Sequence, residues 1–290
     1  MIPIDLLRPY KAKDLVRIGS KYDGGYILPA AVIPNIDAVL SFGLYYNWDF
    51  EKAILEQSPQ LKKMVIGDPF TPIASLYSMM FLYKRMNGAS QDVENNDTIT
   101  AIPPKKSILD KVAYATKKMW LYTRKFLAFK SFLSSNKAKV VFLQKGVSGL
   151  KKERMEGLDY FFSLIPFSNH LLIKMDIEGD EYTLDIAQQI DLKKVECLLI
   201  EFHEIDKNYA KLNTIIEQLQ QNGLFLVHTH LNNSSKLINN CPFTETVELS
   251  FVKASYLENG MHKVVAQKYP IENLDYPCEP SKMDIELYFN

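Results

Sequence analysis

Carboxylate and imidazole side chains follow three apolar runs in the second half of the sequence, where each run would end as a strand. The runs cover 170–179, 195–204 and 223–231, and the polar residues at their ends are Asp176, Glu178, Glu201, His203, His228, His230, Asn232 and Asn233. Alternation along a strand places Glu201 and His203 on one face, and His228 and His230 on one face of the next strand. Such groups at adjacent strand ends can form a general base or bind a divalent cation.

A regular alternation of apolar runs and amphipathic segments predicts the elements that would position these residues. Strands are expected at 36–44, 61–70, 139–147, 170–179, 195–204, 223–231 and 246–254, and helices at 48–57, 151–163, 181–190 and 207–222. Short apolar strands that alternate with helices are typical of parallel strands joined by right-handed crossovers. We therefore predict a single α/β domain over 1–290, with a doubly wound, Rossmann-like seven-stranded sheet whose last strand is antiparallel.

Residues at about 71–136 break this alternation and are predicted to form a helical insertion with helices at 73–86 and 106–133. Between Lys105 and Lys139 the insertion carries ten Lys or Arg side chains and one acid, Asp110. Its aromatic residues can either stack on a sugar or pack as a stripe on the core; they are Tyr114, Trp120, Tyr122, Phe126, Phe129 and Phe132. For the basic side chains we favour recognition of an acidic or phosphorylated substrate over contact with an anionic membrane surface.

Glycines and one acid mark the ends of the first two strands. Gly43 follows the first strand, and the next helix would direct its N-terminus at the crevice. Asp68 ends the second strand, where nucleotide-binding folds keep an acid for ribose hydroxyls. Residues 17–28 are expected to form a hairpin whose Gly24 and Gly25 let backbone amides approach a ligand. A plain strand-to-helix turn, an Asp-Pro turn and an ordinary hairpin are the alternatives.

The overall composition favours some classes of protein over others. A chain of 290 residues with 47% hydrophobic content can bury a sizeable core. Its 34 basic and 34 acidic side chains balance, so no overall field favours nucleic acid as a partner. Three widely spaced cysteines fit neither a disulfide framework nor a CxxC metal site, which favours a reducing cytoplasm. The N-terminus does not resemble a signal peptide, and no apolar run reaches about 18 residues.

The segment LLIKMDIEGDE, at 171–181, resembles the K-x-D-x-E-G-x-E signature of the FkbM-type methyltransferases, which use S-adenosylmethionine. DGGYIL, SFGLYYNWDFE and LIEFHE resemble further blocks of that family in the same order. The similarity runs from about 17 to about 254, excluding the insertion. The first-strand block departs from the fuller D-x-G-x-G form found in many methyltransferases of this fold.

The resemblance implies S-adenosylmethionine as the cofactor. It further implies an O-methyltransferase acting on a small molecule or glycan. As the acceptor we expect a hydroxyl of a sugar or sugar-containing precursor, such as one of a bacterial surface polysaccharide, which the resemblance itself does not name. The residues expected to bind the cofactor are Gly24, Gly25, Tyr26, Gly43, Asn47, Glu51, Asp68, Gln144, Gly146 and Asp176. Of these, Gly43 would hold the methionine part and Asp68 the ribose, while Gln144 and Gly146 would border the adenine. The residues expected to contact the substrate are Glu178, Glu201 and Asn232.

Methyl transfer to a hydroxyl requires removal of the hydroxyl proton. We predict His203 as the base and His230 as the second candidate, with Asp176 as an orienting group or base. If Asp176, Glu201 and His230 converge, Mg²⁺ can bind there and lower the pKa of the substrate oxygen. Two alternatives remain. One is a metal-dependent hydrolase that uses Asp176, Glu178, Glu201, His203 and His230, and the other is a noncatalytic nucleotide-binding protein.

The carboxylates after the strand at 170–179 are expected to have different roles. Asp176 should face the reacting groups, whereas Glu178 should fix the loop by accepting hydrogen bonds and Gly179 should permit the turn. Asp180 and Glu181 should begin the next helix, where negative charge complements the helix N-terminus.

Overall fold

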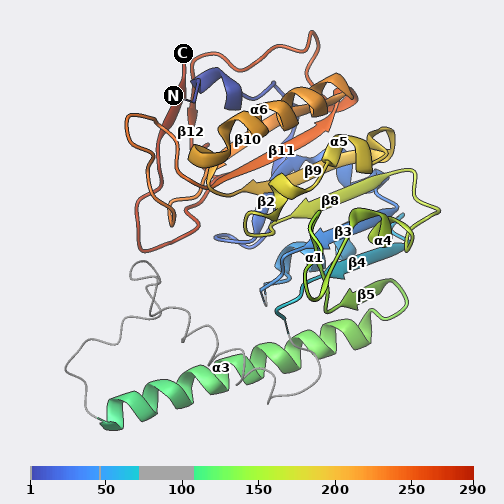
Figure 1. Ribbon diagram of the computed structural model, residues 1–290, viewed down its shortest axis with the longest axis vertical. Helices are drawn as coiled ribbons and strands as arrows, with labels where there is room; N and C mark the ends of the chain where they lie inside the picture. Colours follow the sequence, from blue (N-terminus) through green and yellow to red (C-terminus); the bar gives the residue numbers. More distant parts are fainter. Residues whose placement is uncertain (1, 46, 72–107) are drawn as a thin grey trace.

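The computed structural model describes residues 2–45, 47–71 and 108–290, without the side chains of 108–119, 121 and 122. Seven strands form one sheet in the order β10-β11-β9-β8-β3-β4-β5 (Figure 1). They are β3 (Ala38–Phe42), β4 (Lys63–Gly67), β5 (Val140–Leu143), β8 (Leu171–Met175), β9 (Val195–Phe202), β10 (Leu224–Leu231) and β11 (Val247–Lys253). All neighbours are parallel except β11, which is antiparallel to both β9 and β10. The predicted Rossmann-like α/β fold with an antiparallel last strand is therefore confirmed, with β11 inside the sheet and β10 at its edge.

The central strands are largely apolar because both faces of the sheet are covered. Every residue of β3, β8 and β9 is buried. In β8, Leu171, Ile173 and Met175 pack in the larger hydrophobic core, and Leu172 packs in the second core on the opposite face. Parallel strands buried on two sides have this pattern, which explains why the sequence predicts them well.

The predicted helices differ in how far the structure bears them out. The helices α1 (Asp49–Gln57) and α6 (Ile205–Gln221) are confirmed. The expected helix at 151–163 is wrong over most of its length, because β7 (Met155–Glu156) pairs with β6 (Gly146–Val147) and only α4 (Leu158–Phe162) is helical. This pairing also ends the predicted strand at 139–147 early, at Leu143.

The expected helix at 181–190 is two short pieces, the 3-10 helix η3 (Asp180–Thr183) and α5 (Ile186–Gln189). Leu184 between them is extended, with φ −88° and ψ 135°. The Thr183 hydroxyl donates to the Asp180 carbonyl and accepts from the Gly149 amide, which holds the chain in this break.

The second half of the predicted insertion is the 28-residue helix α3 (Ile108–Ser135), and the expected helix at 73–86 lies outside the described residues. The end of α3 packs beside the sheet through Phe126, Phe129 and Phe132, which are buried. The ring of Phe129 lies 5.0 Å from that of Trp48 and 5.1 Å from that of Phe142. These three aromatics thus form the core stripe, whereas Trp120 is exposed and stacks under Arg124.

Three two-stranded sheets and five 3-10 helices complete the described chain. The predicted hairpin at 17–28 is confirmed as β1 (Leu15–Gly19) and β2 (Gly25–Pro29), and β12 (Gln267–Tyr269) pairs with β13 (Leu287–Phe289) near the C-terminus. The other 3-10 helices are η1 (Ile4–Leu7), η2 (Ala30–Asn35), η4 (Leu192–Lys194) and η5 (Ala254–Tyr256). Within the part of the chain that is described, no helix has the length and apolar character needed to cross a membrane.

Candidate functional site

The carboxyl ends of β3 and β8 meet at Gly43. The residue has φ +79°, and a Cβ there would lie 1.7 Å from the carbonyl oxygen of Asp176. The Asp176 amide donates to the Phe42 carbonyl at 3.1 Å, and the ammonium of Lys174 donates to the Gly43 carbonyl. A side chain at this position would force the two strand ends apart, so glycine is required for their contact.

Asp68, the predicted ribose acceptor, lies at the end of β4 with its carboxylate buried and already hydrogen-bonded. Its Oδ2 accepts from the amides of Leu44 and Tyr45, each at 2.9 Å, and from the Thr71 hydroxyl. Its Oδ1 accepts from the amides of Phe70 and Thr71 at 2.7 and 2.9 Å. The carboxylate therefore ties the loop after β3 to the turn after β4.

Three of the predicted cofactor residues lie together at the tip of the β1–β2 hairpin. The side-chain amide of Asn47 donates from Nδ2 to the Asp23 carbonyl at 2.8 Å, and a Cβ on Gly24 would overlap the Asn47 side chain. A Cβ on Gly25 would lie 2.0 Å from the Ser20 carbonyl oxygen. The Asn47 side chain thus joins the loop after β3 to the backbone of the hairpin.

Tyr26 and Glu51 lie behind this loop. Glu51 is fully buried and accepts from the Ser41 hydroxyl at 2.5 Å, with the Lys174 ammonium 3.8 Å away. The same ammonium lies over the ring of Tyr26 at 5.5 Å. Glu51 therefore positions Lys174, which in turn holds the Gly43 carbonyl.

Gln144 and Gly146, predicted to border the adenine, follow β5 on the far side of β4. Gln144 is half-buried at the end of that strand. The Gly146 amide donates to the Arg154 carbonyl at 2.9 Å, and a Cβ on Gly146 would lie 3.0 Å from the ring of Pro69. Both residues stand next to the turn that carries Asp68.

Four side chains form an open cluster at the ends of β8 and β9: Asp176, Glu178, Glu181 and His203. The His203 Nε2 lies 3.9 Å from Asp176 Oδ1 and 3.6 Å from Glu178 Oε2. On the other side of the ring, His203 Nδ1 lies 3.1 Å from Glu181 Oε1. The side chains of Asp176 and Glu178 are 28% and 81% exposed, so the Nε2 side of the imidazole faces the part that solvent reaches.

Two residues of the open cluster, Asp176 and His203, have pKa values well above their ordinary values. Burial raises the pKa of Asp176 to about 7, and Glu178 and Asp23 add to the rise while Lys174 and His203 oppose it. For His203, burial lowers the pKa, but Glu181 and the other nearby carboxylates outweigh it and bring the value to about 10. His203 is therefore an imidazolium at neutral pH and cannot accept a proton, which argues against its predicted role as base. Asp176 is the group poised to take one.

Glu181 is the residue whose role sequence reasoning missed. It is fully buried, and it accepts from the Gly179 amide at 2.8 Å and from the His203 amide at 2.6 Å, besides facing the imidazole. Glu181 lies in the first turn of η3, as expected, and it also fixes the loop through these bonds; the assignment of the loop-fixing bonds to Glu178, whose side chain is exposed, is wrong. The signal was present, because Glu181 is the last acid of the K-x-D-x-E-G-x-E motif.

The predicted metal set of Asp176, Glu201 and His230 does not come together. Among the described residues two groups of three possible ligands have atoms within 4.8 Å of one another; they are Asp176, Glu178 and His203, and His230, Glu248 and Cys278. Glu201 accepts from the Asn232 amide at 2.8 Å. Burial raises its pKa well above the usual range, and Asp176 and Glu248 raise it further.

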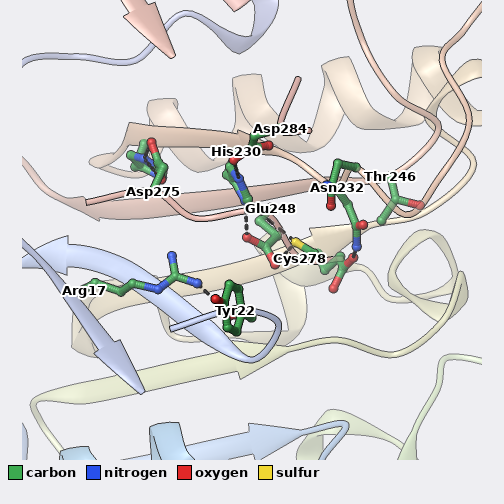
Figure 2. A network of polar contacts seen from close by, with 12 residues as sticks. Arg17, Tyr22, His230, Asn232, Thr246, Glu248, Asp275, Cys278 and Asp284 are labelled. Carbon is green, nitrogen blue, oxygen red and sulfur yellow. Dashed lines mark hydrogen bonds and ion pairs between the residues drawn. The ribbon is translucent and has the colours of Figure 1, made fainter. Parts of the chain in front are cut away.

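His230 belongs to a second, closed cluster with Glu248, Cys278 and Asp284 (Figure 2). Its side chain is 3% exposed, with carboxylates on both ring nitrogens. Burial lowers the pKa of His230, but hydrogen bonds to Asp284, Cys278 and Glu248 raise it well above its ordinary value. His230 thus cannot serve as the base at the open strand ends. His228, on the same strand, pairs instead with Asp275 at 3.0 Å.

A surface hollow of about 450 Å³ lies elsewhere, between η3 and α6. It is lined by Tyr182, Asp185, Lys211 and neighbouring residues, and by none of the predicted site residues. We place the candidate site at the strand ends because the close backbone contacts and perturbed acids are there.

Comparisons with known proteins give no family match and no match among curated proteins. Among solved structures, one similar chain is a proposed tRNA (m1A22) methyltransferase of Streptococcus pneumoniae in complex with S-adenosyl-L-methionine, at 13% identity and a TM-score of 0.30 over 77% of this chain and 69% of the other. Another is precorrin-6y C5,15-methyltransferase of Geobacter metallireducens, at 8% identity and a TM-score of 0.32 over 77% and 87%. Because both identities and both TM-scores are low, the fold assignment rests on the strand order of the chain itself.

Proposed function

We propose that the protein is an S-adenosylmethionine-dependent methyltransferase that acts on a hydroxyl group. The observation that carries the proposal is the place of Asp176: its backbone touches Gly43, and its carboxyl has a pKa of about 7. The signature at 171–181 supports the cofactor. A sugar hydroxyl of a surface-glycan precursor is the acceptor we propose.

The charge of the strand ends fits a cationic ligand. Repulsion from neighbouring carboxylates contributes to the raised pKa values of Asp176 and Glu201. A positive group bound beside them would reduce this repulsion. S-adenosylmethionine, when bound, supplies an electrophilic methyl group on a positively charged sulfonium. We propose that the Gly43 loop, Asn47 and the hairpin glycines hold it beside Asp176.

In this proposal Asp176 would accept the hydroxyl proton of the acceptor while the acceptor oxygen takes the methyl group and the methyl–sulfur bond breaks, so that S-adenosylhomocysteine is the leaving group. The imidazolium of His203, held by Glu181, keeps the neighbouring carboxylates in place and balances their charge. Lys174 holds the Gly43 carbonyl and thereby the geometry of the loop. The proton on His203 stays there through the reaction.

Calorimetric titration with S-adenosylmethionine and S-adenosylhomocysteine tests the proposal. We expect binding with a dissociation constant of roughly 1 µM to 1 mM, which is the usual range for enzyme ligands. Asp176→Asn should retain binding of S-adenosylhomocysteine because it keeps the size of the side chain. If the protein binds neither S-adenosylmethionine nor S-adenosylhomocysteine, the proposal is refuted.

A metal-dependent hydrolase is the second candidate, because Asp176, Glu178 and His203 place three possible ligand atoms within 4.8 Å. It requires neutral His203, whereas the pKa of about 10 favours the cation in the metal-free protein. Titration with Mg²⁺ and Mn²⁺ separates the candidates. A hydrolase would bind one of these ions through Asp176, show hydrolytic activity that a chelator abolishes, and have no affinity for S-adenosylmethionine.

A further inference from the structure

The closed cluster joins three segments that are far apart in the sequence. His230 on β10 and Glu248 on β11 are direct partners across the antiparallel pair. Cys278 and Asp284 come from the C-terminal segment that follows β12. Figure 2 shows the Glu248 carboxylate below the His230 ring, with the Cys278 sulfur beside it. The cluster is therefore one of the places where the C-terminal segment is attached to the sheet.

The spacing of three of these side chains matches a metal site. Glu248 Oε2 lies 2.9 Å from His230 Nδ1, Glu248 Oε1 lies 3.6 Å from Cys278 Sγ, and Cys278 Sγ lies 3.9 Å from His230 Nδ1. Ligand atoms around a tetrahedral zinc ion are separated by roughly 3.3–3.8 Å, given bonds of about 2.0–2.3 Å. These distances join four atoms, namely His230 Nδ1, Cys278 Sγ and the two Glu248 oxygens, and a small movement of the three side chains would accommodate an ion between them.

The fourth member of the cluster orients the histidine in the way metal sites require. Asp284 Oδ2 lies 3.2 Å from His230 Nε2, on the side of the ring opposite Glu248. A carboxylate that accepts from the remote ring nitrogen fixes the tautomer and leaves the other nitrogen free to bind a metal. With Asp284 in this place, Nδ1 is the ligand atom, and it is the nitrogen that faces Glu248 and Cys278.

We propose that His230, Glu248 and Cys278 bind one zinc ion, which fastens the C-terminal segment to β10 and β11. Thiolate, imidazole and carboxylate together favour zinc over magnesium or calcium, which prefer oxygen ligands alone. Cys278 loses its thiol proton and His230 the proton on Nδ1, so binding of Zn²⁺ releases two protons to solvent. The thiolate and the Glu248 carboxylate then balance the charge of the ion.

The site is separate from the proposed methyl transfer and does not depend on it. All three ligands are buried, with 3%, 6% and 7% of their surface exposed for His230, Glu248 and Cys278. A buried structural ion of this kind contributes directly to folding free energy. Without the ion, the same groups form an imidazolium held between two carboxylates, with the thiol hydrogen-bonded to Glu248.

The test is the metal content of the full-length protein, purified without chelator and dialysed against micromolar ZnCl₂. We expect about one zinc per chain for a single occupied site. Cys278→Ser should weaken zinc binding at least about 100-fold, and Asp284→Asn roughly 10- to 100-fold. Cys241→Ser is the matched control, because Cys241 lies outside the cluster and its variant should keep the zinc.

Cobalt substitution provides a readout that does not depend on stability. The wild-type protein loaded with Co²⁺ should show a thiolate-to-cobalt charge-transfer band in the near ultraviolet, and Cys278→Ser should lack it. Zinc below about one tenth of an equivalent in the wild type would refute the proposal. Zinc that Cys278→Ser retains but Asp176→Asn loses would also refute it, because the ion would then belong to the open cluster.

Discussion

In the metal-free protein, the open and closed clusters each place a protonated histidine between carboxylates, yet they differ in their access to solvent. In the open cluster, Asp176 and Glu178 face solvent on one side of His203, and only Glu181 is fully buried. In the closed cluster, the C-terminal segment covers His230, and each acid is at most 11% exposed. The same charges can therefore react with a ligand in the first cluster, whereas in the second they attach one part of the chain to another.

The largest effect that would test this difference is expected from Asp176→Asn. Loss of a general base should lower methyl transfer by about 10²- to 10⁴-fold. The measurement is release of S-adenosylhomocysteine with a panel of sugar acceptors. Glu178→Gln is the control, and an equal loss in both variants would contradict the assignment of Asp176 as base.

The same Asp176→Asn variant should alter the pH dependence of stability. The folded-state pKa of Asp176 is about 7 and its ordinary value is 3.8, so the ionised carboxylate destabilises the fold above pH 7. We expect the variant to be more stable than the wild type at pH 8, and the difference to shrink as the pH falls from about 7 towards 4. Urea unfolding at several pH values measures this, and a difference independent of pH would show that the pKa is not raised.

Truncation of an acidic side chain in the closed cluster should destabilise the fold far more than truncation of an acidic side chain in the open cluster. Glu248→Ala leaves His230 and Cys278 without their shared partner, and loss of one partner from a buried ion pair costs about 3–5 kcal/mol. Glu178→Ala changes an exposed side chain and should remain within about 0.5 kcal/mol of the wild type. Urea denaturation of both variants compares the two clusters directly, and similar losses would remove the distinction between them.

A side chain at Gly43 should disturb the open cluster through the backbone. Gly43→Ala places a Cβ against the Asp176 carbonyl at positive φ, and we expect a loss of about 2–3 kcal/mol together with weaker binding of S-adenosylmethionine. Gly157→Ala is the matched control, because no atom lies within 4 Å of a Cβ there. Calorimetry and thermal unfolding measure both effects; wild-type affinity in Gly43→Ala would separate the loop from the cofactor site.

The most local effect is a change in the titration of His203. Glu181→Gln removes the negative partner on Nδ1, so the His203 pKa should fall from about 10 towards its ordinary 6.5. In the wild type the raised pKa stabilises the fold fully below pH 6.5, and this contribution is lost as the pH rises through 10. Proton–nitrogen NMR of the imidazoles, assigned with His203→Gln, follows the shift, while the His230 signals should not move.

The positions of the strands were accessible from sequence because parallel strands buried on both faces are largely apolar, as β8 and β9 are. The convergence of Asp176 and His203 followed from their places at adjacent strand ends. The closed cluster could not be predicted from the sequence, because Cys278 lies 48 residues after His230 in a segment without regular periodicity. The protonation of His203 likewise depends on the burial of Glu181, which no spacing in the chain reveals.

The described packing of helix α3 lies at one end. Its 28 residues rise about 42 Å, and Phe129 and Phe132, in its last third, pack beside Trp48, while its other end points away from the sheet in Figure 1. Because these aromatics attach the last turns to the sheet, the helix extends from the sheet as an arm whose base is part of the core.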